Sequence, residues 1–280
     1  MISFVGQQLR LAPGANRGTP PQPGACYLGK FFMRLVSLGC LTVFLILVTA
    51  GLGFSADSAS KSGGDQAQAF LRQGEAAFNN GDYDGAAQAY RQAVKVKPNL
   101  APAHYGLGLS LARQERYQEA AAAFQEALQH KPSYTQARKD LGVAYLKLKR
   151  WPEAEKAFKS CLKEQPQDPE TYYGLGLAEG KQGKHQEARE SFEKALRLKP
   201  DYVPAWNNLG MANIKLNRWA EAKSSFEKAL SLKSDNAEAH LGLLACYIQQ
   251  GDSEAAARTY RTLAAMDKAL RKKADEILGR

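Results

Sequence analysis

One spacing dominates this sequence, because the same residue types return every 34 positions over most of its length. Prolines keep this spacing from Pro98 to Pro200, and Leu-Gly pairs keep it from Leu107 to Leu209. Small and aromatic columns share the phase: Ala86, Ala120, Ala154, Ala188, Ala222 and Ala256, and Tyr90, Phe124, Phe158, Phe192, Phe226 and Tyr260. Such a period predicts stacked copies of one unit, since a single unit cannot bury its apolar face alone.

The unit itself is a pair of helices. In residues 101–134, both halves place apolar residues at helical spacing, and a polar break at Gln114–Arg116 separates them. Pro132 has no N–H and ends the second half, and Ser133 after it is a good helix N-cap. We therefore predict two antiparallel helices per unit, each new pair capped by the residue that follows the proline.

The pattern resembles the tetratricopeptide repeat (TPR) family, which carries Trp, Leu-Gly and Tyr in its first helix and Ala, an aromatic residue and Pro in its second. Residues 135–168 match with Leu141-Gly142, Tyr145, Ala154, Phe158 and Pro166. The resemblance implies an all-α fold, a right-handed superhelix (solenoid) of antiparallel helix pairs. We predict six repeats: 67–100, 101–134, 135–168, 169–202, 203–236 and 237–270. A capping helix starts at Asp267, and its end occupies 271–280.

The N-terminal region reads as a targeting segment. Residues 35–54 hold no charge, Lys30 and Arg34 precede them, and no cation follows before Lys61. This asymmetry sends the downstream chain across the membrane. We predict an exported protein, either periplasmic after cleavage of a signal peptide at 33–56 or held by that segment as a single transmembrane anchor facing the periplasm of a bacterium.

The flanking segments have compositions that cannot build a core. Residues 1–32 are rich in Gly, Pro and Gln, which suggests a disordered leader or an over-extended gene start, with a cytoplasmic tail as the alternative. Residues 57–66 are small and polar, and we predict a flexible linker there.

Composition and charge exclude several classes of function. The chain is 44% hydrophobic and 24% charged, which disfavours disorder and multi-span membrane proteins. The net charge of +10 falls to +6 over residues 57–280, too little clustering for a nucleic-acid binder. Cys161 and Cys246 lie far apart in the repeats and are predicted to be buried thiols. His104 and His240 stand four repeats apart and cannot share a metal. The sequence also carries no phosphate loop, no nucleophile elbow and no paired-histidine helix motif, so we predict no metal, no cofactor and no enzyme activity.

The concave groove is the remaining candidate site. TPR ligands commonly contact repeat positions 5 and 9 in the first helices, so the resemblance implies a partner-binding groove at Tyr105, Leu109, Lys139, Val143, Tyr173, Leu177, Asn207 and Met211. Apolar strips with aromatic anchors suit a protein or peptide. The alternative is that these side chains only pack against neighbouring helices.

Position 13 carries a file of cations: Arg113, Lys147, Lys181 and Lys215. Such a basic edge would attract an acidic peptide segment or an anionic polymer. The alternative is structural, because a cation in the last turn of a helix offsets the negative end of its dipole.

These observations predict a non-catalytic scaffold of the cell envelope that binds a peptide or protein, within a secretion, pilus or wall-assembly complex. Membrane contact is expected only through residues 35–54. One alternative is a regulatory or targeting subunit of an envelope enzyme such as a glycosyltransferase. Another is a cytoplasmic adaptor whose apolar segment inserts in the opposite sense.

Overall fold

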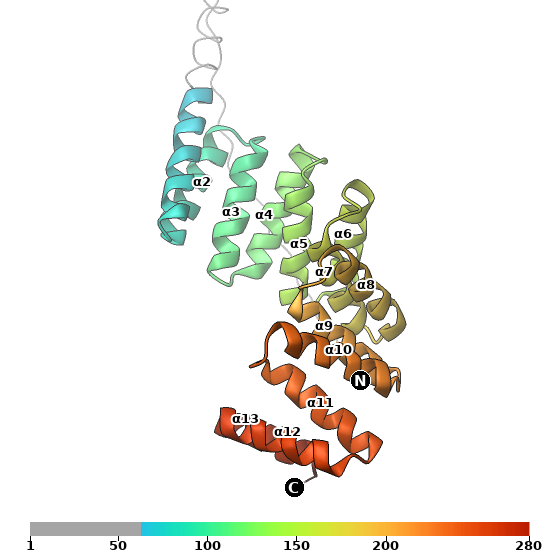
Figure 1. Cartoon of the computed structure of the whole chain (residues 1–280). Helices are drawn as coiled ribbons and strands as arrows, with labels where there is room; N and C mark the ends of the chain where they lie inside the picture. Colours follow the sequence, from blue (N-terminus) through green and yellow to red (C-terminus); the bar gives the residue numbers. More distant parts are fainter. Residues whose placement is uncertain (1–62, 280) are drawn as a thin grey trace, which may run out of the picture. The chain divides into compact units, whose positions relative to one another are not determined.

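A computed structural model describes residues 63–279, which are almost entirely helical (Figure 1). The first helix covers residues 63–79. The following helices are α2 (Tyr83–Val96), α3 (Ala101–Arg113), α4 (Tyr117–His130), α5 (Thr135–Lys147), α6 (Trp151–Glu164), α7 (Pro169–Lys181), α8 (His185–Leu198), α9 (Val203–Lys215), α10 (Trp219–Leu232), α11 (Ala237–Gln250), α12 (Ser253–Met266) and α13 (Lys268–Ile277). From α3 to α11, first helices of successive repeats begin 34 residues apart.

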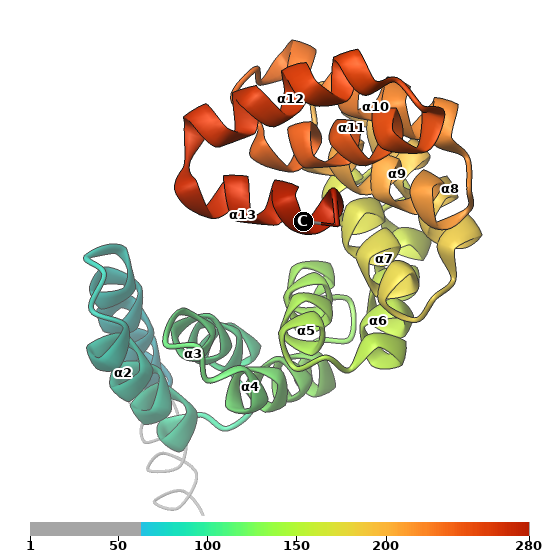
Figure 2. The ribbon, with the colours of Figure 1, turned by 90° about the horizontal axis from the view of Figure 1, so that it is seen from below.

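The helices stack in sequence order as an α-solenoid, which confirms the fold class. Each helix packs on the next one along the chain, and the first helices also touch directly: α5 packs on α7, α7 on α9 and α9 on α11. Figure 2 shows the odd-numbered helices on the inner side of the curve and the even-numbered helices outside. The first helices therefore form one continuous inner face.

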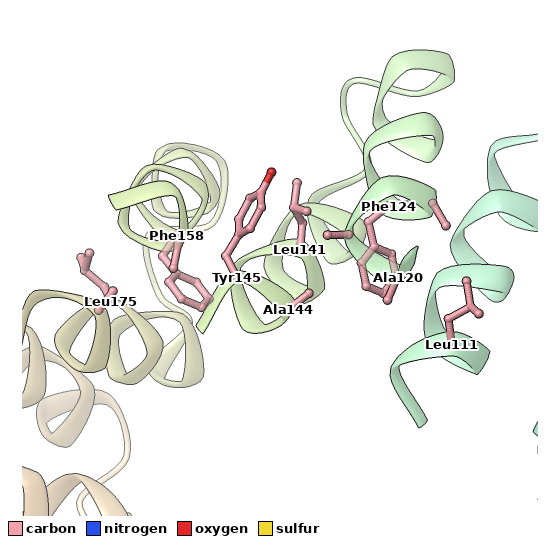
Figure 3. Packing of buried hydrophobic residues seen from close by; sticks show 12 residues of the cluster. Leu111, Ala120, Phe124, Leu141, Ala144, Tyr145, Phe158 and Leu175 are labelled. Atoms are coloured by element: carbon pink, nitrogen blue, oxygen red, sulfur yellow. The ribbon is translucent and has the colours of Figure 1, made fainter. Parts of the chain in front are cut away.

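An aromatic ring holds each repeat to the next. The rings of Phe124 and Phe158 lie between the helices of neighbouring repeats (Figure 3), and both side chains are fully buried. Glycines make room for such rings: a Cβ on Gly210 would approach Phe226 to 2.6 Å, and one on Gly242 would approach it to 2.3 Å. The small residues of the repeat are therefore required by contacts between elements, not by helix formation.

The turn inside each repeat needs a left-handed residue. Gly81, Gly183 and Gly251 have φ between 73° and 80°, as expected for glycine at a helix end. The equivalent positions in the other repeats hold Glu115, Lys149 and Asn217 with φ near 60°. Position in the repeat thus dictates the backbone conformation even where glycine is missing.

The predicted N-caps are wrong by one residue. Lys97, Pro98, Asn99 and Leu100 form a turn in which the Leu100 N–H donates to the Lys97 carbonyl at 3.1 Å, and α3 starts only after it. Proline favours the second place of such a turn, so the polar residue after it lies within the turn. Side-chain caps occur one position later, at Asp168 and Asn236.

The N-terminal end of the repeat array differs from prediction, whereas the C-terminal helix starts where it was expected. Helix begins at residue 63, so residues 63–66 of the predicted linker 57–66 are helical. Asp65 lies in the first turn, where a carboxylate is favourable, and Ala67 is fully buried. At the other end, Asp267 follows α12 and caps α13 through the Ala269 N–H, so the helix begins where the capping helix was expected.

The predictions for residues 1–32 and 33–56, and for 57–62 of the linker, lie outside the described residues. Within residues 63–279 the structure holds no helix that is both long and apolar enough to cross a membrane.

Candidate functional site

The predicted groove residues fall into three groups by exposure. Val143 and Met211, both at position 9, are 43% and 46% exposed on α5 and α9. The half-buried group comprises Tyr105, Leu109, Lys139, Tyr173 and Leu177. Asn207 is buried, so the prediction that it faces the groove is wrong. The Asn207 side chain donates to Asn236 Oδ1 at 3.2 Å and to Glu238 Oε2 at 3.0 Å, which accounts for its burial.

A pocket of about 540 Å³ opens between α5 and α7 on this face. Four predicted groove residues, Lys139, Val143, Tyr173 and Leu177, line it, and so do two residues of the predicted basic edge, Lys147 and Lys181. The structure thus brings the two predicted features together at the junction of the third and fourth repeats.

Sequence reasoning missed the base of this pocket. Leu146, Trp151, Phe158 and Gly174 also line it. Gly174 lacks a Cβ, and one placed there would come within 2.6 Å of the Phe158 ring, so the glycine leaves the ring covered only thinly. The available signal was a glycine two positions before the usual Leu-Gly glycine, which occurs at Gly106, Gly174 and Gly242 but not in the intervening repeats.

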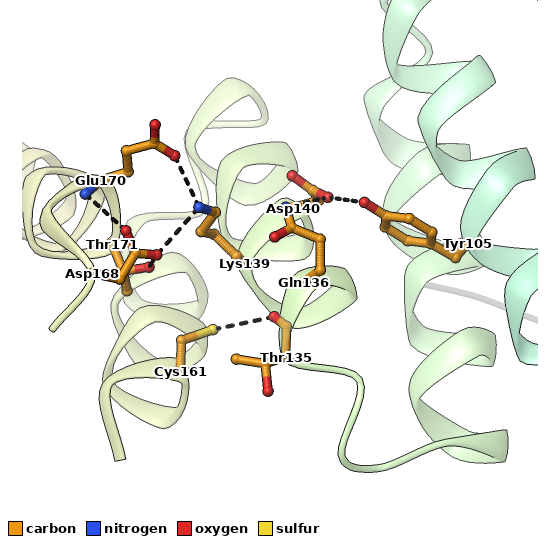
Figure 4. Close-up of polar contacts among 9 residues, drawn as sticks. All are labelled: Tyr105, Thr135, Gln136, Lys139, Asp140, Cys161, Asp168, Glu170 and Thr171. Carbon is orange, nitrogen blue, oxygen red and sulfur yellow. Dashed lines mark hydrogen bonds and ion pairs between the residues drawn. The ribbon is translucent and has the colours of Figure 1, made fainter. Parts of the chain in front are cut away.

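Polar contacts fix the position-5 side chains between repeats (Figure 4). Tyr105 Oη donates to Asp140 Oδ2 at 2.8 Å, and Lys139 Nζ lies 2.9 Å from Glu170 Oε2 and 3.2 Å from Asp168 Oδ2. Burial raises the pKa of Asp140, although hydrogen bonds from Tyr105 and Gln136 act the other way. Burial lowers the pKa of Lys139, but hydrogen bonds to Glu170 and Asp168 outweigh it, so that pKa is raised. The Lys139 ammonium group therefore stays charged, and the carboxylates of Asp168 and Glu170 compensate its charge.

The basic edge is not uniform. The Arg113 guanidinium lies over the rings of Phe78 and Tyr83, 5.8 Å and 5.9 Å from their centroids, which ties it to the repeat before it. Lys147, Lys181 and Lys215 are exposed, and none pairs with a carboxylate of residues 63–279. The free cationic edge thus runs from the third to the fifth repeat.

The histidines and cysteines have structural roles. His104 Nε2 and His240 Nε2 lie 2.7 Å and 3.1 Å from the carbonyls of Pro98 and Ser234, and Trp206 Nε1 makes the equivalent bond to Pro200. Cys161 and Cys246 are buried free thiols, as predicted, and burial raises the pKa of each to about 11. Among the described residues, no group of three or more His, Cys, Asp or Glu side chains is arranged to hold a metal.

The stacked helix hairpins, the 34-residue spacing and the inner face define a tetratricopeptide repeat protein. The model of one TPR family, the cilia and flagella-associated protein 70 C-terminal domain, matches residues 45–276. The chain belongs to this family.

Solved structures share the fold. MamA (residues 41 to the end) from Desulfovibrio magneticus RS-1 is 24% identical, with a TM-score of 0.59 over 62% of this chain and 98% of that one. PilF of Pseudomonas aeruginosa is 19% identical, with a TM-score of 0.65 over 78% and 99%. PilW, described as a type IV pilus biogenesis factor, is also 19% identical, with a TM-score of 0.65 over 76% and 98%. No curated protein matches the sequence at a significant level.

Proposed function

We propose that this protein is a non-catalytic interaction scaffold of the cell envelope, whose inner face binds a peptide or protein. The observation that carries the proposal is the 540 Å³ pocket between α5 and α7. Its walls are mostly apolar, and Lys147 and Lys181 stand at its rim. Concave apolar pockets with few polar groups are typical binding sites, and rim charges add specificity and rate of association.

The rigidity of the solenoid supports this function. Position-5 side chains are held by contacts such as Tyr105 to Asp140, so the inner face is formed before a partner arrives. A preformed surface limits the entropy lost by the protein on binding. Most of the conformational entropy lost on binding then comes from the partner.

Two observations favour the envelope. Residues 35–54 form an uncharged run preceded by Lys30 and Arg34, typical of an export signal or an anchor. The structural neighbour PilW is described as a pilus biogenesis factor. The sequence identity of 19% between PilW and this chain indicates a shared fold. A role in a pilus or secretion complex is therefore a more specific proposal than a location in the envelope.

Site-specific photo-crosslinking tests the proposal. A benzophenone amino acid replaces Val143 in the inner pocket or, as a control, Leu232 at the end of outer helix α10, which is 40% exposed. We expect envelope fractions to yield one partner crosslinked from position 143 and not from position 232. Equal capture from both positions, or capture from neither, would contradict binding at the inner face.

Location is tested separately by protease accessibility. If the repeats face the periplasm, protease added to spheroplasts digests them. Protection until the inner membrane is lysed would instead establish a cytoplasmic adaptor.

A further inference from the structure

The inner face repeats with a period of two TPR units, and this second period is visible in the contacts. Tyr105 donates to Asp140, and Asn208 donates to Tyr173 at 3.3 Å, which is the same pair of positions two repeats later. Lys139 bonds Glu170 at 2.9 Å, and Asn207 bonds the equivalent Glu238 at 3.0 Å. Repeats three and five are thus alike, and so are repeats two and four.

Part of the pocket lining recurs at the same interval. Six of the lining residues, from α5, α6 and α7, have counterparts: Val143, Leu146, Lys147, Trp151, Phe158 and Gly174. The residues 68 positions later have the same chemical characters: Met211, Ile214, Lys215, Trp219, Phe226 and Gly242. We call these the first and second subsites. Other lining residues differ, since Gln249 stands where the pocket has Lys181.

The geometry of the two sets agrees as well. Val143 and Met211 are the exposed apolar side chains, at 43% and 46%. A Cβ on Gly174 or Gly242 would lie 2.6 Å or 2.3 Å from the ring beneath, so each glycine packs flat on a phenylalanine. Lys147 and Lys215 end their helices, exposed and outside the ion pairs found in residues 63–279.

The corresponding set one period earlier lacks these properties. Gly106 packs on the Tyr90 ring, so the glycine and the aromatic residue are present. However, Glu75 takes the place of Val143 and is exposed, and Asn79 takes the place of the lysine. An acid in place of the apolar residue, and an asparagine in place of the lysine, disfavour the ligand that suits the other two sets.

We infer that the two subsites bind one extended segment of a partner protein, which carries two bulky apolar side chains, each next to an acidic residue. The inference rests on the proposed function. The apolar side chains pack against the exposed Val143 and Met211, and the acids meet Lys147 and Lys215. Opposite charges at the rim guide and orient such a segment.

The spacing of the anchors follows from helix packing. Neighbouring packed helices lie about 8–10 Å apart, and α5, α7 and α9 are consecutive neighbours on the inner face. The subsites are then roughly 16–20 Å apart, which an extended chain covers in about five or six residues. Side chains of an extended chain face the same way at even separations, so a spacing of six is expected.

Synthetic peptides test this directly by fluorescence anisotropy with the purified repeat protein. The main probe carries two Leu-Asp pairs six residues apart in a Ser/Gly background. Comparison peptides carry the pairs three residues apart, one pair only, or Leu-Lys in place of Leu-Asp, and a poly-Asp peptide has no apolar anchor. We expect the six-residue probe to bind at least tenfold more tightly than any of them, since the second contact is intramolecular.

Surface variants locate the contacts. Val143→Glu or Met211→Glu should each reduce the affinity of the six-residue probe to that of the one-pair peptide, whereas Leu232→Glu on α10 should leave it unchanged. Lys147→Glu with Lys215→Glu should weaken the Leu-Asp probe at least tenfold and strengthen the Leu-Lys peptide. All of these positions are exposed, so circular dichroism should report an unchanged helical content.

The results that overturn the inference differ from those that overturn the function. Affinity independent of anchor spacing, equal binding of poly-Asp, or no binding of any peptide would refute the two-anchor segment. A partner still crosslinked from position 143 in that case would leave the inner-face function standing.

Discussion

Adding one methyl group to a helix should have opposite effects at two glycines of this solenoid. Gly242, in α11, sits against Phe226, and a Cβ there would be 2.3 Å from the ring. The ring has little room to move, because it is fully buried and Gly210 also packs against it. Gly180, near the end of α7, would place its Cβ 3.7 Å from that of Ala188, an ordinary contact.

The relative sizes of two opposing free-energy terms decide whether each substitution stabilises or destabilises the protein. Replacing a helical glycine by alanine stabilises a helix by about 0.8–1 kcal/mol. Overpacking a filled core costs about 1–3 kcal/mol. Gly180→Ala should therefore raise the free energy of unfolding by up to ~1 kcal/mol, and Gly242→Ala should lower it by up to ~2 kcal/mol.

Urea unfolding followed by circular dichroism measures both, provided that the slopes with denaturant agree. Phe226→Leu, combined with Gly242→Ala, completes a double-mutant cycle, and a smaller loss in the double variant than the sum of the single losses is expected. If Gly242→Ala stabilises the protein as much as Gly180→Ala does, the glycines are not required by the aromatic rings and the packing argument fails.

Two further predictions concern the turns and the charges. Lys149→Gly should stabilise the protein by about 0.5–1 kcal/mol, since Lys149 has φ 59°, whereas Gly183→Ala at the same repeat position should destabilise it; urea midpoints that move in the same direction would contradict this. Burial raises the pKa of Glu155, but hydrogen bonds from Lys159, Lys184 and Gln182 outweigh it and lower the pKa to about 2. The folded state then binds fewer protons than the unfolded state, so this contribution to stability is present above pH 4.5 and is lost as the pH falls towards 2. Glu155→Gln should remove that part of the acid dependence in thermal melts, whereas the exposed Glu126→Gln should keep it, and unchanged melts in both would refute the network.

The sequence predicted which residues line much of the inner face, but not which of their side chains are buried in contacts with the next repeat. At position 9, Val143 and Met211 are exposed as expected, whereas Leu109 and Leu177 are half-buried. Position 5 was misjudged at Asn207, which is buried and bonds Asn236 and Glu238 of the neighbouring turn and repeat. Contacts between residues about 30 positions apart leave no periodic signal within one helix, so their effect on burial could not be read from the pattern.

The N-caps show the same limit at short range. A polar residue follows each proline, which suggested a cap, yet the turn from Lys97 to Leu100 places Asn99 before the helix. The backbone hydrogen bond of the turn, and not the side chain, sets the start of α3.

The sequence by itself predicts the period, the helix pairs and the small residues between them. Each of these features depends on residues three or four apart within one helix or on a repeated column. The pocket is decided only by tertiary structure. Its floor, Phe158, belongs to one repeat and the glycine above it, Gly174, to the next, and the space between them exists only when the two repeats stack. Local patterns determine which elements form, whereas the site depends on how non-local neighbours share a surface.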